Sequence, residues 1–227
     1  MLQGVEMAVR TRVKICGLTR EADIDQAVQA GADAIGFVCF AGSKRYVDPA
    51  RAAELRRRVP AFVSVVALFV NPTPQAVRQV QQDVGPDLLQ FHGDESPSEC
   101  RRYGQRYLRA FRVGAPGLDS AASLAAACAD YDDAAGWLFD SYSAGFGGSG
   151  QGFDHRLLAD VLRDPRARPL VLAGGLHADN LGGALAQVRP WAVDVSSGVE
   201  SAPGLKDAAK LAAFFDGIKK FDHDLHT

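Results

Sequence analysis

The chain has 227 residues, 47% of them hydrophobic and 23% charged, and a formal net charge of −2 at pH 7. This composition is typical of a globular protein large enough to bury its own core. Without a basic excess, we expect neither nucleic acid nor an anionic membrane as a partner. The first twelve residues lack a long apolar run, which argues against a signal peptide or membrane anchor.

Short apolar runs alternate with amphipathic segments along the chain. The runs predict eight strands at 13–16, 33–40, 62–70, 87–92, 107–113, 136–140, 169–174 and 191–196. The segments between and after them predict helices at 20–30, 49–58, 74–84, 97–105, 119–129, 154–163, 178–188 and 206–220. Three helix starts carry a capping residue before proline, and Ser96 with Glu99 also fits a capping box.

The regular rhythm of these units indicates one α/β fold. Strands that are apolar on both faces and separated by helices predict a parallel sheet covered by helices. Eight units without a break favour a single closed (β/α)8 barrel (a TIM barrel) over an open doubly wound sheet, whose glycine fingerprint is missing after the first strand. We expect an N-terminal extension at 1–12, the barrel at 13–222 and a tail at 223–227.

The four cysteines fit no zinc or redox spacing, and the histidines do not pair with acidic residues in a metal-binding pattern. We therefore expect free thiols, a reducing cytoplasmic location and no metal site. Cys39, Cys100 and Cys128 are assigned to packing.

In such a barrel the active site lies where the strands end. This rule selects Cys16, Arg45, Gln90, His92, Arg112, Asp140, Gly174, Gly175, Asp194, Ser197 and Gly198. The loops AGGL (173–176) and SSGVE (196–200) follow the last two strands, the usual phosphate site of these barrels. Either loop alone fits an ordinary turn, but both together favour phosphate binding.

The possible acid and base each have a plain structural alternative. Asp140 ends an apolar strand, where it is either an acid or a capping or salt-bridging residue. Judged by residue type alone, Cys16 is expected to be a small apolar residue of the core. Its place at the end of the strand also allows it to act as a general base. Arg45 is expected at the mouth, either clamping a carboxylate or solvated. His92 is equally suited to orienting substrate or satisfying a backbone group, and Asp194 is expected to have a buried partner.

These motifs, in this order, resemble those of the phosphoribosylanthranilate isomerase family of tryptophan biosynthesis. The resemblance spans about residues 13–220 and is most specific in KICG (14–17) and DVSSGVE (194–200). It also covers GADAIGFV (31–38), SKRYV (43–47), LFVNP (68–72), LQFHGDE (89–95), LRAFRV (108–113), GGSGQGFD (147–154), LAGGL (172–176) and PGLKD (203–207).

The resemblance implies an Amadori rearrangement of N-(5'-phosphoribosyl)anthranilate to 1-(2-carboxyphenylamino)-1-deoxyribulose 5-phosphate. It makes Asp140 the general acid that protonates the furanose ring oxygen, and Cys16 the base that removes the C2 proton. Arg45 would hold the anthranilate carboxylate. The phosphate would lie on the backbone of Gly174–Gly175 and Ser197–Gly198.

Other interpretations stay open at this point. A sister isomerase of histidine biosynthesis uses aspartate at the end of the first strand, which Cys16 argues against. Epimerase and lyase barrels use metals or a catalytic lysine, and Lys14 is expected to face away from Cys16. A phosphate-binding barrel without catalysis would need neither Cys16 nor Asp140. We also expect a monomer, with a homodimer as the alternative, and a glycine-rich loop at 145–152 that closes over substrate.

Overall fold

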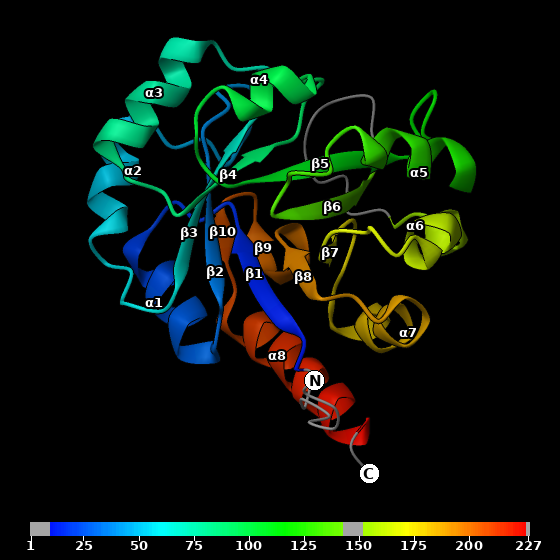
Figure 1. Ribbon diagram of the computed structural model, residues 1–227. Coiled ribbons are helices and arrows are strands. Elements are labelled where there is room, and N and C mark those ends of the chain that lie inside the picture. The colour runs from blue at the N-terminus through cyan, green and yellow to red at the C-terminus, as the bar shows by residue number, and fades with distance from the viewer. Residues whose placement is uncertain (1–9, 143–151, 226–227) are drawn as a thin grey trace, which may run out of the picture.

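The computed structural model describes residues 10–142 and 152–225. Eight parallel strands form a closed barrel in chain order, and β1 pairs with β8 to close it (Figure 1). The strands are β1 (Arg12–Cys16), β2 (Ala34–Val38), β3 (Ser64–Phe69), β4 (Leu88–Phe91), β5 (Tyr107–Val113), β6 (Gly136–Ser141), β7 (Leu170–Leu172) and β8 (Ala192–Val195). The predicted barrel is therefore confirmed.

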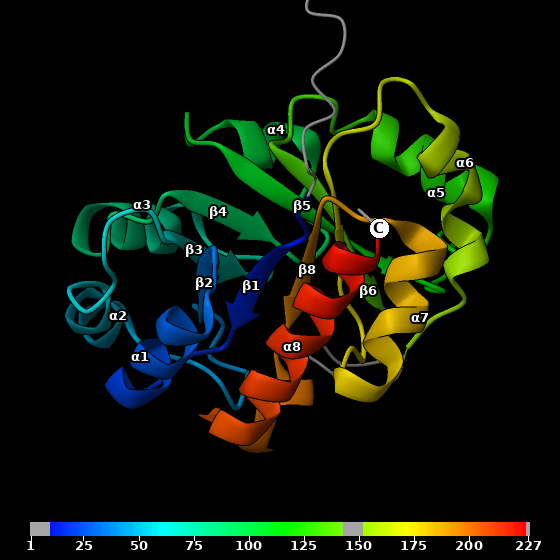
Figure 2. The same cartoon turned by 90° about the horizontal axis from the view of Figure 1, so that it is seen from below.

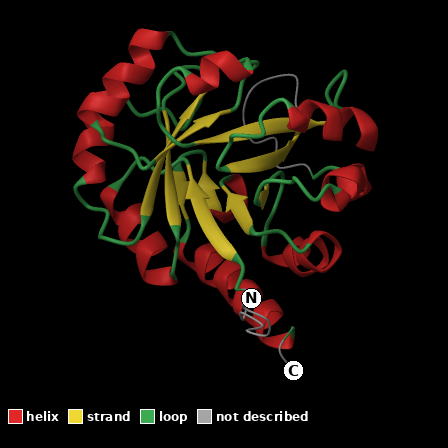
Figure 3. Ribbon diagram, viewed as in Figure 1, coloured by secondary structure: helices red, strands yellow, loops and turns green. Residues whose placement is uncertain are grey.

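Helices surround this barrel, as the view turned by 90° shows (Figure 2). They are α1 (Glu21–Ala30), α2 (Pro49–Arg56), α3 (Pro74–Asp83), α4 (Pro97–Arg101), α5 (Ala121–Ala129), α6 (Ala159–Arg163), α7 (Ala178–Val188) and α8 (Ala208–Asp224). Strands occupy the centre and helices the outside (Figure 3). This arrangement buries the outward faces of the strands, where Phe37, Phe69, Phe91 and Phe139 are fully enclosed.

The three predicted capping residues form the expected bonds. Asp48, Thr73 and Ser96 each accept a hydrogen bond from the backbone N–H three residues further on. The Glu99 carboxylate in turn accepts a hydrogen bond from the Ser96 backbone N–H at 2.7 Å, which completes the capping box. These local bonds explain why the starts of α2, α3 and α4 could be predicted.

The element ends differ from expectation in a few places. Helix α4 stops at Arg101, and Gly104 soon follows with φ of 62°, a left-handed conformation that ends a helix. The sixth helical segment begins as a 3₁₀ turn, η1 (His155–Leu158). An unpredicted 3₁₀ turn, η2 (Ser197–Val199), leads into a short antiparallel hairpin of β9 (Glu200–Ala202) and β10 (Leu205–Lys206).

The two ends of the described barrel are joined directly. Asp222 on α8 accepts hydrogen bonds from the backbone N–H of Thr11 at 2.9 Å and from its hydroxyl at 2.7 Å. Strand β1 begins at Arg12 and α8 continues to Asp224, so both elements pass the boundaries expected at 13 and 222. The hydrogen bonds of Thr11 attach the residue before β1 to α8.

The expectation that Lys14 faces away from Cys16 is wrong. Side chains two positions apart on a strand share a face. A Cβ added to Gly36 would meet the Cys16 Sγ at 2.9 Å and the Lys14 Nζ at 3.1 Å, so both side chains lie inside the barrel beside this glycine. Gly36 therefore makes room for both side chains.

Candidate active site

One pocket opens at the carboxyl ends of the strands. It collects nine of the predicted site residues, which are Cys16, Arg45, Gln90, His92, Asp140, Gly174, Gly175, Asp194 and Ser197. Gly198 instead borders an adjoining pocket that shares Gly175 and Ser197. The parallel strands explain this convergence, because their carboxyl ends meet at one face of the barrel.

Cys16 ends β1 and lies against an apolar wall. Its side chain packs with Val38, Leu68 and Val70, and the residue is 5% exposed. This burial raises the pKa of the Cys16 thiol, an effect that the charge of Lys14 opposes. The protein therefore favours the neutral thiol, and the lysine is what makes a thiolate more accessible. As predicted, Cys39, Cys100 and Cys128 are free thiols that pack in or against the hydrophobic core.

Lys14 and Asp194 form an ion pair inside the barrel. The Lys14 Nζ lies 2.9 Å from both carboxylate oxygens of Asp194, and both side chains are almost fully buried. Burial alone would lower the pKa of Lys14, but the charge of Asp194 and the neighbouring Cys16 raise it above its ordinary value. Asp194 thus has the buried partner that was expected. The two-residue spacing of KIC was the signal for placing Lys14 beside Cys16.

Asp140 lies one residue before the end of β6, on another part of the pocket wall. Its Oδ1 accepts a hydrogen bond from the Ser141 backbone N–H at 2.8 Å, and its Oδ2 lies 3.3 Å from the His92 Nε2. The His92 Nδ1 lies 3.3 Å from the Gln90 Nε2. Gln90 and His92, two residues apart at the end of β4, thus form a polar chain that leads to Asp140.

The loops after β7 and β8 are packed backbone against backbone. Gly174 and Gly175 have φ of 85° and 62°, a region that glycine adopts without strain. A Cβ on Gly198 would lie 1.9 Å from the Leu176 carbonyl oxygen, so only glycine permits this approach. Ser197 and Gly198 begin η2, where backbone N–H groups lack partners within the turn. Such groups suit an anion.

Arg45 lines the pocket but is largely enclosed, with only 11% of its side chain exposed. Its Nε and Nη2 donate hydrogen bonds to the two carboxylate oxygens of Glu200 at 2.8 and 2.7 Å. Lys206 also contacts Glu200, at 2.8 Å. We did not predict Glu200 or Lys206 as site residues, although both lie in motifs of the family resemblance. The signal that could have identified them is that both are charged residues in these motifs to which the sequence analysis assigned no role.

Besides Gly198, Arg112 is the other predicted residue that does not line this pocket. Its Nη2 donates a hydrogen bond to Asp94 at 2.7 Å, and its guanidinium lies 5.8 Å from the centre of the Tyr142 ring. Arg112 follows the inward alternation of β5, but its charged end turns toward the rim formed by these neighbours. An assignment from strand position alone could not anticipate that pairing.

Metal-binding clusters are not found in the described part of the chain. Within residues 10–142 and 152–225, no group of three or more histidine, cysteine, aspartate or glutamate residues is arranged to hold a metal ion. Nor does any helix there have the length and apolar character to cross a membrane. The loop expected to close over substrate, 145–152, lies outside the described residues except for Gly152.

Comparisons with known proteins agree with this geometry. The family model described as N-(5'phosphoribosyl)anthranilate (PRA) isomerase matches residues 13–217. An N-(5'-phosphoribosyl)anthranilate isomerase of Bordetella avium is 72% identical over 219 residues, covering 96% of this chain and 100% of the relative. One of Dechloromonas aromatica is 50% identical over 217 residues, covering 96% and 100%.

Solved structures give the same result. A phosphoribosyl anthranilate isomerase in complex with reduced 1-(o-carboxyphenylamino)-1-deoxyribulose 5-phosphate aligns with a TM-score of 0.80 and 35% identity, covering 92% of this chain and 99% of the other. The enzyme from Thermotoga maritima aligns with a TM-score of 0.82 and 37% identity over the same shares. The chain therefore belongs to the N-(5'-phosphoribosyl)anthranilate isomerase family.

Proposed function

We propose that this protein converts N-(5'-phosphoribosyl)anthranilate to 1-(2-carboxyphenylamino)-1-deoxyribulose 5-phosphate in tryptophan biosynthesis, with Asp140 as acid and Cys16 as base. Membership of the isomerase family supports the reaction. The observation that carries the residue assignment is the single pocket lined by both groups and by the two glycine loops. An aldose–ketose isomerisation needs one proton donor and one acceptor near adjacent carbons, and this pocket supplies both.

Asp140 acts first in the proposed sequence. Its carboxyl group donates a proton to the furanose ring oxygen, the ring opens, and the nitrogen lone pair forms an iminium at C1. His92 contacts Asp140 through Nε2 and is itself contacted by Gln90 through Nδ1, which supports a role in holding the carboxyl group in place. The iminium then serves as the electron sink, so the proposed mechanism uses neither a metal nor an organic cofactor.

Cys16 acts second. Its thiolate removes the proton from C2, the electron pair of that C–H bond forms a C1=C2 double bond, and the π electrons of the iminium move onto nitrogen to give an enolamine. Loss of the proton on the C2 oxygen and protonation of C1 then yield the ketone. Lys14 lies beside the thiol within the barrel and favours the thiolate electrostatically. The bonds and charges balance without an external reductant or oxidant, because hydrogen is only moved from C2 to C1 with exchange through the acid and base.

The two ends of the substrate suit the two ends of the pocket. We place the phosphate on the backbone of Gly174–Gly175 and Ser197–Gly198, where N–H groups face an anion. The anthranilate carboxylate belongs at Arg45, which supplies guanidinium donors at the pocket. Gln90, His92 and Asp194 complete the substrate surroundings, whereas the contacts of Arg112 support a role at the rim.

The remaining assignments are also proposals. We propose a cytoplasmic enzyme whose partner is the small phosphosugar substrate and not nucleic acid or a membrane. We propose a monomer, with 1–12 as extension, 13–222 as barrel and 223–227 as tail, although β1 begins one residue before this barrel range and α8 ends two residues after it. One solved relative is described as monomers generated from the dimeric Thermotoga maritima enzyme, so mass measurement in solution is the direct check of oligomeric state.

Turnover of freshly prepared N-(5'-phosphoribosyl)anthranilate, followed by loss of its fluorescence, tests the assignment. We expect activity in the parent protein and losses of about 10²–10⁴-fold in Cys16→Ala and in Asp140→Asn, the usual contribution of a proton-transfer group. Cys39→Ala is the matched control, because it removes another free thiol that packs against the core. An inactive parent would reject the function, and undiminished activity in both variants would reject the residue roles.

A further inference from the structure

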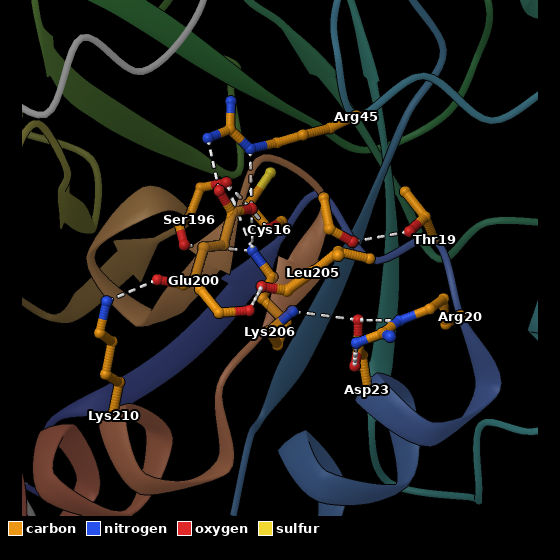
Figure 4. Close-up of polar contacts among 12 residues, drawn as sticks. Cys16, Thr19, Arg20, Asp23, Arg45, Ser196, Glu200, Leu205, Lys206 and Lys210 are labelled. Carbon is orange, nitrogen blue, oxygen red and sulfur yellow. Dashed lines mark hydrogen bonds and ion pairs between the residues drawn. The ribbon is translucent and has the colours of Figure 1, made fainter.

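A charged network joins Arg45, which lines the pocket, to Glu200 and Lys206 (Figure 4). Glu200 begins β9 and Lys206 ends β10, so the hairpin places their side chains together at 2.8 Å. The side chains of both residues are almost completely buried, at 4% and 0% exposed. Lys206 also donates to the Ser196 carbonyl oxygen at 3.1 Å. This bond ties the hairpin to the end of β8.

The hairpin is attached to the barrel at further points. The Thr19 hydroxyl donates to the Gly204 carbonyl oxygen at 2.7 Å, and the Lys206 backbone N–H donates to Asp23 at 3.1 Å. Lys210 on α8 donates to the Glu200 carbonyl oxygen at 2.7 Å. The backbone of the hairpin that carries Glu200 is therefore positioned by contacts with α1, α8 and the loop after β1 (Figure 4).

Glu200 occupies one edge of the Arg45 guanidinium. That edge is formed by Nε and Nη2, which bind the two carboxylate oxygens side by side. A guanidinium has five N–H donors, and a second edge, formed by Nη1 and the other Nη2 hydrogen, can bind another carboxylate in the same plane. Within the described part of the chain, no hydrogen bond uses the Arg45 Nη1.

The stem of Arg45 is confined as well. A Cβ on Gly17 would lie 2.4 Å from the Arg45 Cδ, so the arginine crosses directly over the glycine that follows Cys16. Gly17 has φ of 75°, which only glycine adopts easily. The Arg45 backbone N–H donates to the Ser43 hydroxyl at 3.1 Å. Few orientations of the guanidinium are compatible with these contacts.

The charges in the network leave a surplus for a ligand. Arg45 and Lys206 are positive and Glu200 is negative, so the three groups carry one net positive charge. Without Lys206, the Glu200 carboxylate would neutralise Arg45 and repel an incoming anion. With Lys206, Glu200 can orient Arg45 while the site stays attractive to one carboxylate.

We propose that Glu200, braced by Lys206, is a positioning residue that sets this enzyme's selectivity for a substrate bearing an aromatic carboxylate. It holds the guanidinium so that its second edge faces the pocket. The carboxylate then binds without the orientational freedom of a long side chain having to be lost at that moment. This inference rests on the proposed function, since it names how that site recognises one end of its substrate.

The test compares two ligands of the purified protein by calorimetry. One is reduced 1-(o-carboxyphenylamino)-1-deoxyribulose 5-phosphate, and the other is the same compound with a phenylamino group that lacks the carboxylate. The ratio of their Kd values measures carboxylate selectivity. The decisive variant is Glu200→Gln/Lys206→Met, which keeps the net charge and approximate volume of the network but removes the support of Arg45.

We expect this double variant to lower the Kd ratio by about tenfold, the size of one well-placed charge-assisted hydrogen bond, with little change for the phenylamino ligand. Arg45→Met should lower the ratio further and gives the maximum effect. Glu21→Gln is the matched control, because Glu21 pairs with Arg51 at the surface and not at the pocket. It should leave the ratio unchanged.

Two outcomes would overturn the inference. An unchanged ratio would make the network purely structural, and a higher ratio would mean that Glu200 competes with the substrate for Arg45. Unchanged binding of the phenylamino ligand shows that the variant is folded. Failure of the proposed function has a different result, because the parent protein would then bind neither ligand and would not turn over N-(5'-phosphoribosyl)anthranilate.

Discussion

Two walls of the pocket are built from different interactions. One wall, called the base wall after the role proposed for Cys16, consists of Cys16 and Asp194 with the buried Lys14, which binds both oxygens of the Asp194 carboxylate at 2.9 Å. The other, called the acid wall after the role proposed for Asp140, consists of Asp140, His92 and Gln90 at the ends of β4 and β6, where the side-chain contacts are longer, at 3.3 Å. Charged groups form the contacts of the base wall, whereas the contacts of the acid wall come from groups that can take part in a hydrogen bond as donor or as acceptor.

This difference suits the proposed chemistry. A thiol in an apolar setting needs a fixed positive charge to become a base, and a lysine held by an aspartate supplies one. An acid must lose and regain its proton in each turnover, so partners that donate in one state and accept in the other are preferable to a permanent cation. Histidine and glutamine have both capacities.

The largest expected effect comes from breaking the ion pair of the base wall. Lys14→Met leaves Asp194 buried and unpaired, and we expect the free energy of unfolding to fall by about 3–5 kcal/mol. It also removes the charge that opposes the burial-raised pKa of the Cys16 thiol. That pKa rises further, so the thiolate forms at higher pH and the rising limb of kcat/KM moves upward. Denaturant unfolding and a pH–rate profile measure both effects.

A substitution of Asp194 sharpens this prediction. It breaks the same ion pair but should shift the pKa of the Cys16 thiol in the opposite direction. Asp194 raises the pKa of Cys16, so Asp194→Asn should move the rising limb to lower pH. Limbs that shift in the same direction in Lys14→Met and Asp194→Asn would show that the ion pair acts only through packing. The double variant Lys14→Met/Asp194→Leu should recover much of the lost stability.

A smaller effect is expected where the base wall continues into the two loops that we propose to bind phosphate. In Gly198→Ala the new Cβ collides with the Leu176 carbonyl oxygen, and separating the loops should lower stability by about 1–3 kcal/mol. The KM for substrate should rise by about tenfold or more through lost phosphate contacts, since each 1.4 kcal/mol of binding energy is tenfold. Steady-state kinetics and thermal unfolding measure the two changes.

Gly182→Ala is the control for that substitution. Gly182 lies on the exposed face of α7, and a Cβ there meets no atom within 4 Å. Alanine should stabilise the helix by about 0.5–1 kcal/mol and leave KM unchanged. A KM for Gly198→Ala that matches the parent would remove this loop from phosphate binding.

The smallest effect on stability is expected in the acid wall. Gln90 is fully buried, and its Oε1 has no hydrogen-bond partner among the described residues. Gln90→Leu should therefore change the free energy of unfolding by less than about 1 kcal/mol, because an unsatisfied polar atom is also removed. Turnover should fall by about tenfold as His92 loses its Nδ1 partner. A turnover within twofold of the parent would limit Gln90 to packing.

The sequence predicted the barrel well because its signals are local. Apolar runs mark the strands, and a capping oxygen before proline marks the starts of α2, α3 and α4. The hairpin of β9 and β10 was missed because strands of three and two residues carry no periodic pattern. Its form depends on contacts with distant elements, such as the bond between Thr19 and Gly204.

The site was predicted by strand position, which locates backbones better than side-chain ends. Cys16 and Asp140 are short and stay where their strands end. Arg45 and Arg112 are long, and their guanidinium positions are decided by Glu200 and Asp94, which lie far away in the sequence. Neither pairing has a local signal.

The bonds between Thr11 and Asp222 have a practical consequence for engineering. They bring the start of β1 and the end of α8 together at the amino-terminal end of the barrel, whereas Cys16 and the pocket lie where the strands end. A linker attached before β1 or after α8 would therefore extend from the end of the barrel opposite the pocket. The barrel is thus suited to tethering, to fusion with a second enzyme, or to circular permutation that joins these neighbouring ends.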